Sequence, residues 1–236
     1  MSAPVVETHK LSMLYGQSPV LREIDFKLLP GYGAFVIGGN GAGKSTLLRI
    51  LAGMAAPTAG GALIFGRDTR RMSARYRRRI GMMAHQSFLY PNLTARENLE
   101  FYAALYGLPE PRVSAETWLD KVGMAQFADA RVRAVSRGME QRLSAARALI
   151  ADPLLVLLDE PFASLDSDGA AIMARLIREA LDRGASVVAA MHGVPAIAGT
   201  DFQVFELARG HLGPFTPKEE ETTAWTGARI RSLLHR

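Results

Sequence analysis

The 236-residue sequence contains no cysteine. Disulfide bonds and thiolate metal sites are therefore excluded, and a reducing compartment is permitted but not required. Apolar runs such as Leu154–Leu158 are far shorter than the roughly 20 residues that a membrane-spanning helix needs. The N-terminal segment MSAPVVETHK holds no apolar stretch of signal-peptide length. We therefore expect a chain that depends on another protein for any span through a membrane.

Internal repeats and low-complexity linkers are also absent. Hydrophobic residues make up 48% and charged residues 22%, which is typical of a globular protein and allows one large α/β domain. The net charge is +5, and six arginines lie in RRMSARYRRR, residues 70–79. This segment predicts either a solvated helix surface or a surface that faces anionic lipid or an acidic partner. Nucleic acid is disfavoured, because no aromatic residues are interleaved in a binding pattern.

The first and last thirds of the chain show α/β patterns. Apolar residues alternate at Ile24, Phe26 and Leu28, which predicts a strand, and Val5–Tyr15 alternates more loosely. The short strand AFVIGG leads into a glycine-rich loop and then into the helical pattern STLLRILAGM. Later, the strands LLVLLDEP and ASVVAAMHG flank a predicted helix that ends at Gly184, and two short strands follow.

The middle of the chain predicts helices and no strand. Thr94 and Glu97 form a capping box at the start of LTARENLEFYAALYG, and further helices are predicted around SAETWLDKVG and from Met139 onward. We therefore expect one domain over 1–236. It has a nucleotide-binding core (1–86 and 151–213), a helical insert (87–150) and a C-terminal tail (214–236).

The segment GGNGAGKST fits the pattern G-x-x-x-x-G-K-[ST] with Gly38, Gly43, Lys44 and Ser45. A strand precedes it and a helix follows, which is the context that this motif requires. Glycines let backbone N–H groups turn toward phosphates, and the helix N-terminus adds a partial positive charge. Lys44 would reach the β- and γ-phosphates, and Ser45 would place its hydroxyl on Mg²⁺. The sequence therefore predicts a nucleoside-triphosphate site.

The strand LLVLLDEP delivers two carboxylates to its C-terminal end. In an open α/β sheet this end lies beside the phosphate loop. Asp159 could bind Mg²⁺ through its water shell, and Glu160 would sit close to a water that attacks the γ-phosphate. Either residue could also be a plain strand end, but the phosphate loop favours a catalytic pair.

Several weaker signals occur in a fixed order along the chain, and together they carry a family resemblance. They are Tyr15-Gly16, the phosphate loop, Gln86, the stretch VSRGMEQR, the Asp159 strand, Ser164–Asp166 and His192. From about Val5 to Leu212 the chain resembles the ATP-binding subunit of an ABC transporter. The resemblance implies a P-loop NTPase core, α/β in class, with an antiparallel β-subdomain and an inserted α-helical subdomain.

The resemblance also implies roles for individual residues. Tyr15 would stack on adenine, Gln86 would touch Mg²⁺ or the attacking water and sense the membrane partner, and His192 would hold the γ-phosphate. Asp166 would contact a facing subunit. The implied ATP-binding residues are Tyr15, Gly38, Asn40, Gly41, Gly43, Lys44, Ser45, Thr46, Ser136 and Gly138. The implied catalytic residues are Lys44, Gln86, Glu160 and His192, and the implied Mg²⁺ ligands are Ser45, Gln86 and Asp159.

The stretch VSRGME departs from the usual L-S-G-G-Q of that family at Val135, Arg137 and Met139. Ser136 keeps a hydroxyl and Gly138 permits a close approach, so both would reach the γ-phosphate of ATP held by the opposite subunit. Arg137 could point away from the nucleotide or add a cation near the γ-phosphate. The resemblance thus implies a subunit that completes its sites by pairing with a second ATPase subunit, most simply a homodimer.

The segments HQSFLYPNLTARENLEFYAALYG and LLDEPFASLDSDGAAIMARL look most like the ATPase of the bacterial haem exporter of cytochrome c maturation. Exporters of drugs, sodium or polysaccharides stay open as alternatives, and a soluble ABC ATPase acting on nucleic acid is disfavoured. The expected partners are transmembrane permease subunits, at the cytoplasmic face of the cell membrane. A GTPase is disfavoured because no Asn-Lys-x-Asp motif occurs.

Overall fold

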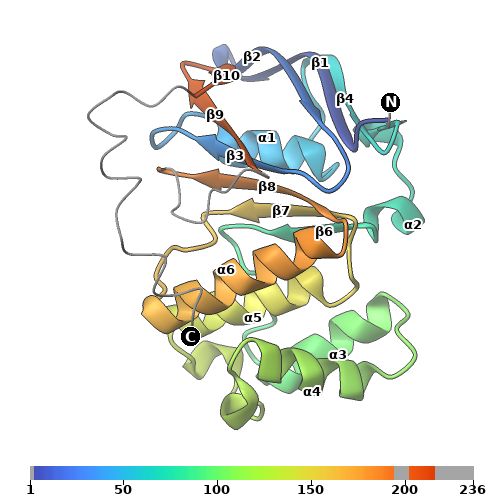
Figure 1. Cartoon of the computed structure of the whole chain (residues 1–236), viewed down its shortest axis with the longest axis vertical. Helices are drawn as coiled ribbons and strands as arrows, with labels where there is room; N and C mark the ends of the chain where they lie inside the picture. The colour runs from blue at the N-terminus through green and yellow to red at the C-terminus, as the bar shows by residue number, and fades with distance from the viewer. Residues whose placement is uncertain (1–2, 194–201, 216–236) are drawn as a thin grey trace.

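The computed structural model describes residues 3–193 and 202–215. Most of the predicted tail therefore lies outside the described residues. Two sheets stand one above the other, with α1 between them and the remaining long helices on the far side of the lower sheet (Figure 1). The smaller sheet is antiparallel, with strand order β2-β1-β4-β5, and the larger has the order β10-β9-β3-β8-β7-β6. This architecture confirms the predicted fold class.

The strands of the antiparallel sheet are β1 (Val6–Tyr15), β2 (Ser18–Leu28), β4 (Ala59–Ile64) and β5 (Arg67–Asp68). Those of the larger sheet are β3 (Gly33–Ile37), β6 (Ile80–Met83), β7 (Leu155–Asp159), β8 (Ser186–Met191), β9 (Phe202–Ala208) and β10 (His211–Pro214). The α-helices are α1 (Lys44–Leu51), α2 (Ala74–Arg77), α3 (Ala95–Leu105), α4 (Pro111–Lys121), α5 (Arg137–Leu149) and α6 (Ser167–Asp182).

Strand β7 shows why the larger sheet is covered on both faces. All five of its residues are buried, and side chains alternate between faces along a strand. Leu155 and Leu157 pack into the cluster that includes α1. Val156 and Leu158 pack into the cluster that includes α5 and α6. A continuous apolar run, rather than an alternating one, is therefore the sequence pattern of this strand.

Two predicted helix starts are corrected by the structure. The helix α4 begins at Pro111, earlier than the predicted segment around Ser114, because proline is favoured in the first turn of a helix. The helix α5 begins at Arg137 rather than Met139, since Ser136 supplies its N-cap. The capping box of Thr94 and Glu97 is confirmed at the start of α3. The boundaries proposed for the core, the helical insert and the tail stay a prediction.

The close approach of α5 to β6 depends on Gly81. A Cβ at this position would lie 2.2 Å from the Ala148 carbonyl oxygen and 2.7 Å from Pro153 Cγ. We expect Gly81→Ala to lower the free energy of unfolding by about 1–3 kcal/mol, because the added methyl group overpacks the contact. Urea denaturation measures the change. Gly213→Ala is the matched control, since a Cβ there meets no heavy atom within 4 Å. Equal stability of the two variants would contradict the close approach.

Candidate functional site

Three parallel strands end at one edge of the larger sheet. In the hydrogen-bonded register, Ile37 of β3 lies opposite Met191 of β8, and Asp159 of β7 lies opposite Ala190. The phosphate loop follows β3, Glu160 follows β7 and His192 follows β8. Because the carboxyl ends of parallel strands share an edge, three segments far apart in sequence deliver their side chains to one place.

The phosphate loop is shaped by glycines at which a positive φ or a close contact disfavours any side chain. Gly43, the N-cap of α1, has a φ of 103°, and Gly41 has a φ of 75°. A Cβ at Gly43 would lie 2.9 Å from the Val20 carbonyl oxygen, and one at Gly38 would lie 2.4 Å from the Leu207 carbonyl oxygen. The first turn of α1 contains no acidic residue that could compete with an anion. The loop is therefore a backbone cradle suited to phosphate.

Lys44 is held at this cradle by three oxygen atoms. Its ammonium group is buried and donates to the carbonyl oxygens of Gly38 at 2.7 Å and Gly39 at 3.2 Å. Its Nζ atom also lies 3.6 Å from Oε1 of Glu160. A buried ammonium needs such partners, because burial without them costs several kcal/mol. Lys44 and Glu160 are thus adjacent, as predicted.

Glu160 has an unusual backbone conformation, with a φ of 51°. Hydrogen bonds fix it on both sides: its N–H donates to the Ala190 carbonyl oxygen at 2.9 Å, and its own carbonyl oxygen accepts from Nε2 of Gln141 at 2.9 Å and from the Ala163 N–H at 3.1 Å. The carboxylate atom Oε1 lies 3.3 Å from Nε2 of His192. This buried oxygen has no hydrogen-bond partner within the described residues.

A cleft of about 460 Å³ lies beside Glu160. Gln86, Asp159 and Glu160 line it together. The strand-like pattern of IGMMAHQ predicts that Gln86 ends a strand, but β6 ends at Met83 and Gln86 extends from the loop that follows. Arg137 of the variant stretch VSRGME lines the same cleft.

The loop that carries Gln86 is held by contacts with α3 and α5. The sequence alone did not predict these contacts. Ser87 Oγ donates to Oε1 of Glu140 at 2.6 Å, and the Tyr102 hydroxyl donates to the Phe88 carbonyl oxygen. The Arg147 guanidinium lies 5.3 Å from the Phe88 ring centroid and 5.5 Å from that of Tyr102. Burial lowers the pKa of Arg147. Residues Ser87 and Phe88 therefore join Gln86 to α3 and α5.

The stretch VSRGME lies at the start of α5. The Ser136 hydroxyl caps this helix by accepting from the Met139 N–H at 3.3 Å, so its hydrogen remains available to an acceptor. A Cβ at Gly138 would lie 2.9 Å from the Ser164 carbonyl oxygen of the same chain. Asp166 caps α6 by accepting from the Gly169 N–H at 2.8 Å. Ser136 and Asp166 thus both have structural roles within the chain.

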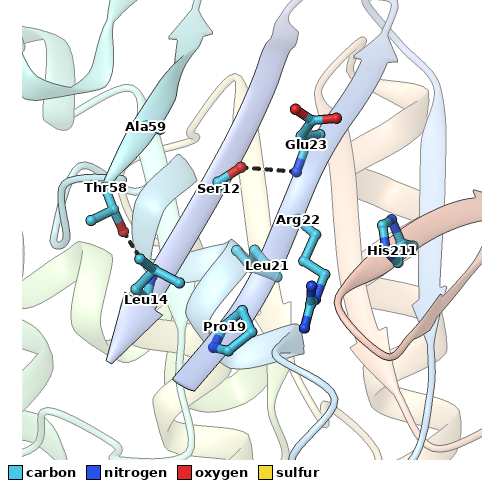
Figure 2. A pocket seen from close by; sticks show the side chains of 9 residues that line it. All are labelled: Ser12, Leu14, Pro19, Leu21, Arg22, Glu23, Thr58, Ala59 and His211. Atoms are coloured by element: carbon cyan, nitrogen blue, oxygen red, sulfur yellow. Dashed lines mark hydrogen bonds between the residues drawn. The ribbon is translucent and has the colours of Figure 1, made fainter. Parts of the chain in front are cut away.

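Tyr15 lies at the end of β1, where it pairs with Ser18, and half of its surface is exposed. Along β2 from this pair, Val20 contacts Gly43 of the phosphate loop. A separate hollow of about 420 Å³ lies on the antiparallel sheet (Figure 2). None of the predicted site residues lines it. Its lining consists of Ser12, Leu14, Pro19, Leu21, Arg22, Glu23, Thr58, Ala59 and His211.

The donor set at the sheet edge suits Mg²⁺ better than a transition metal. The described residues contain no group of three or more histidine or acidic side chains that could hold a metal ion by themselves. Mg²⁺ commonly takes only one or two protein carboxylates and fills its shell with phosphate oxygens and waters. The oxygen donors of Ser45, Asp159 and Gln86 fit that habit. The phosphate cradle and the paired carboxylates together define a nucleoside-triphosphate-binding P-loop protein.

Comparison with known proteins narrows this class. Residues 21–163 match the family described as ABC transporter. A cytochrome c biogenesis ATP-binding export protein, CcmA 1 of Cupriavidus metallidurans, is 36% identical over 192 residues, which is 81% of this chain and 93% of that protein. A Nod factor export ATP-binding protein I of Paraburkholderia xenovorans is 34% identical, over 81% of this chain and 64% of that protein.

Solved structures agree with these sequence matches. An ATP-binding subunit of an ABC transporter superimposes with a TM-score of 0.80 at 26% identity, over 98% of each chain. A dimeric ATP-binding cassette bound to ADP and Pi has a TM-score of 0.80 at 24% identity, over 90% of this chain and all of that one. This chain belongs to the ABC transporter family, as one of its ATP-hydrolysing, nucleotide-binding subunits.

The hydrogen bond from Gln141 to the Glu160 carbonyl oxygen generates a prediction. We expect Gln141→Ala to lower kcat for ATP hydrolysis by about 10-fold, because a displacement of about 1 Å at a catalytic group costs up to 10²-fold. The dissociation constant for ATP should not change, since Lys44 keeps its partners. Steady-state kinetics and nucleotide titration separate the two effects. Exposed Gln126→Ala is the matched control, and an unchanged kcat in Gln141→Ala would contradict a positioning role.

Proposed function

We propose that this chain is the ATP-driven motor subunit of an exporter, and that the haem exporter of cytochrome c maturation is its closest functional type. The observation that carries the motor role is the grouping of Lys44, Glu160 and His192 at one edge of the sheet, with contacts of 3.3–3.6 Å. The export role rests on relatives whose names describe export, of which the CcmA protein matches over nearly its whole length.

In this proposal the phosphates of ATP lie against the backbone N–H groups of the loop from Gly38 to Thr46, and Tyr15 stacks on the adenine. Lys44 exchanges its carbonyl partners for β- and γ-phosphate oxygens. Mg²⁺, held by Ser45, Asp159 and Gln86, would supply charge neutralisation at the phosphates when bound. The loop residues that would face the phosphates are Gly38, Asn40, Gly41, Gly43, Lys44, Ser45 and Thr46.

Glu160 acts as the general base. Its carboxylate accepts a proton from the attacking water, and the strained backbone holds the carboxylate in place. His192 lies 3.3 Å from the same carboxylate, and in this proposal it donates to the γ-phosphate. Lys44 and His192 both lie within contact distance of Glu160. Binding of ATP by these two residues therefore also positions Glu160 as the base.

A second copy of the chain completes each site. Ser136 has a hydroxyl hydrogen to donate, and it lies at the N-terminus of α5, where a phosphate is favoured. In the homodimer Ser136 and Gly138 reach the γ-phosphate held by the partner, and Asp166 contacts the facing subunit.

The membrane permease supplies the transport path. The helices in residues 3–193 and 202–215 include none that is long and apolar enough to span a membrane. The loop with Gln86 contacts the permease, which places the chain at the cytoplasmic face of the cell membrane. Purification from that membrane and identification of what accompanies the chain tests the cargo type. Recovery of nucleic acid without a permease would contradict the proposal.

Glu160→Gln should retain ATP but hydrolyse it about 10²–10⁴-fold more slowly, because the positioned base is lost. ATP then persists between two subunits, so the variant should form a dimer in the presence of ATP. Light scattering and a single-turnover assay report the two effects. Glu110→Gln, at an exposed carboxylate, is the control. A monomer with near-normal hydrolysis would refute the assignment of the base.

Mixing two inactive variants tests whether Ser136 acts across the interface. Ser136→Arg blocks the approach to a partner's phosphate, and Lys44→Ala removes a phosphate donor, which we expect to cost about 10²–10³-fold. In a mixed dimer both lesions fall in one site if Ser136 acts on the partner's nucleotide, and the other site is intact. Hydrolysis should therefore reappear on mixing.

A second mixture serves as the control for this experiment. Lys44→Ala and Glu160→Gln both damage the site of their own chain, so every site in their mixed dimer keeps one lesion and activity should stay absent. Exchange of subunits is followed by energy transfer between labelled chains. If the Ser136→Arg mixture exchanges and stays as inactive as this control, action across the interface is wrong.

A further inference from the structure

The positive charge of this chain is concentrated in one segment, 65–80. Seven arginines and one aspartate give it a charge of +6, whereas the whole chain carries +5. All other residues together therefore carry a formal charge of −1. A charge this localised creates a directed potential at one surface rather than a general basicity. The arginines are Arg67, Arg70, Arg71, Arg75, Arg77, Arg78 and Arg79.

Only one of these arginines is neutralised by a carboxylate within the described residues. Asp68 accepts hydrogen bonds from Arg70 at 2.6–3.1 Å, and these bonds lower the pKa of Asp68. In residues 3–193 and 202–215, the other six arginines form no ion pair with a carboxylate. We call these six the arginine surface: Arg67, Arg71, Arg75, Arg77, Arg78 and Arg79.

Aromatic rings hold two guanidinium groups of this surface in place. Arg67 lies 4.4 Å from the ring centroid of Tyr76, and Arg79 lies 4.2 Å from that of Phe65 and 5.4 Å from that of Tyr76. A stacked guanidinium keeps its N–H donors at the edge of the plane, where they can bind phosphate. The two cations share one ring, so their mutual repulsion favours an anion between or above them.

The segment itself is anchored, so the arginines form a fixed surface. Met72 is buried in the core cluster of the upper sheet, and Thr69 is 2% exposed. The short helix α2 contains no buried residue, and Arg75 and Arg77 point from it into solvent. Two buried side chains, Met72 and Thr69, thus hold this exposed positive surface in place.

The arginine surface continues onto α3. A Cβ at Gly107, just beyond the end of this helix, would lie 3.7 Å from the Arg78 guanidinium. Leu105 and Phe101 of α3 are 64% and 42% exposed. Arg78 therefore reaches the C-terminal end of a helix that exposes apolar side chains, and basic groups near apolar ones are typical of surfaces that lie against a membrane. The loop with Gln86 follows β6, the strand after the arginine segment, and leads into α3.

We propose that the arginine surface binds the phosphate headgroups of anionic lipids, beside the permease that the proposed function places at the loop with Gln86. This inference rests on that function only for the presence of a membrane. Single-stranded nucleic acid fits less well, because binding it requires exposed rings for the bases. The rings within the arginine segment, Tyr76 and Phe65, are covered by Arg67 and Arg79, and the exposed ring of Phe101 lies on α3, outside this segment.

The test is co-sedimentation of the full chain with vesicles. One set contains only phosphatidylcholine, and the other replaces a third of it with phosphatidylglycerol. We expect binding to the anionic set alone, and weaker binding as salt is raised, because salt screens surface charge. The triple variant Arg71→Gln, Arg75→Gln, Arg77→Gln should lower the partition coefficient by roughly 100-fold, since each arginine near an anionic surface contributes about 5-fold.

The control variant removes the same charge elsewhere, with Arg112→Gln, Arg133→Gln and Arg209→Gln at exposed positions. Equal losses in the two triple variants, or equal binding to both vesicle sets, would overturn the proposal. Duplex DNA that displaces the chain from anionic vesicles at equal phosphate concentration would overturn it in favour of nucleic acid. ATP titration of the same preparations separates the hypotheses: intact ATP binding with no lipid binding refutes only this inference.

Discussion

The backbone of Glu160 is the constraint on which the site depends. Its φ of 51° costs about 1–3 kcal/mol for a residue that is not glycine, so neighbouring structure must enforce it. Strand β8 does so through the Ala190 carbonyl oxygen, and helix α5 does so through Gln141. The carboxylate consequently faces Lys44 and His192 instead of continuing along the strand. The parallel sheet and α5 are thus both needed to build one catalytic position.

The helix α5 also joins the other functional segments of the chain. Ser136 begins the helix, Glu140 binds the loop after Gln86, Gln141 binds Glu160, and Arg147 stacks beneath Phe88. Residues along the length of one helix therefore contact different parts of the site. A shift of α5 would move all of these contacts together, because a helix is stiff over this length. This arrangement gives a short physical route from the loop with Gln86 to the hydroxyl of Ser136.

The sequence predicted those features whose chemistry is contiguous along the chain. The phosphate loop, the capping box of Thr94 and Glu97, and the buried strand before Asp159 each carry their full signal within about ten residues. The partnership of Ser87 with Glu140 spans 53 positions and that of Gln141 with Glu160 spans 19, so only tertiary packing defines them. The sequence placed the starts of α4 and α5 too late, because the residues at a helix N-terminus lie outside the apolar period that predicts the helix. The structure begins these helices at Pro111 and Arg137.

Gly138 has a consequence for the reading of genetic data. A Cβ at this position would lie 2.9 Å from the Ser164 carbonyl oxygen of the same chain. Any side chain at this position would disturb the loop before α6, whether or not a partner subunit is present. An inactive allele at Gly138 would therefore be interpreted as a loss of nucleotide contact, although its cause is a displaced loop before α6 within one subunit. Alleles at Ser136 carry a related ambiguity, because its exposed hydroxyl also caps α5 within the same chain.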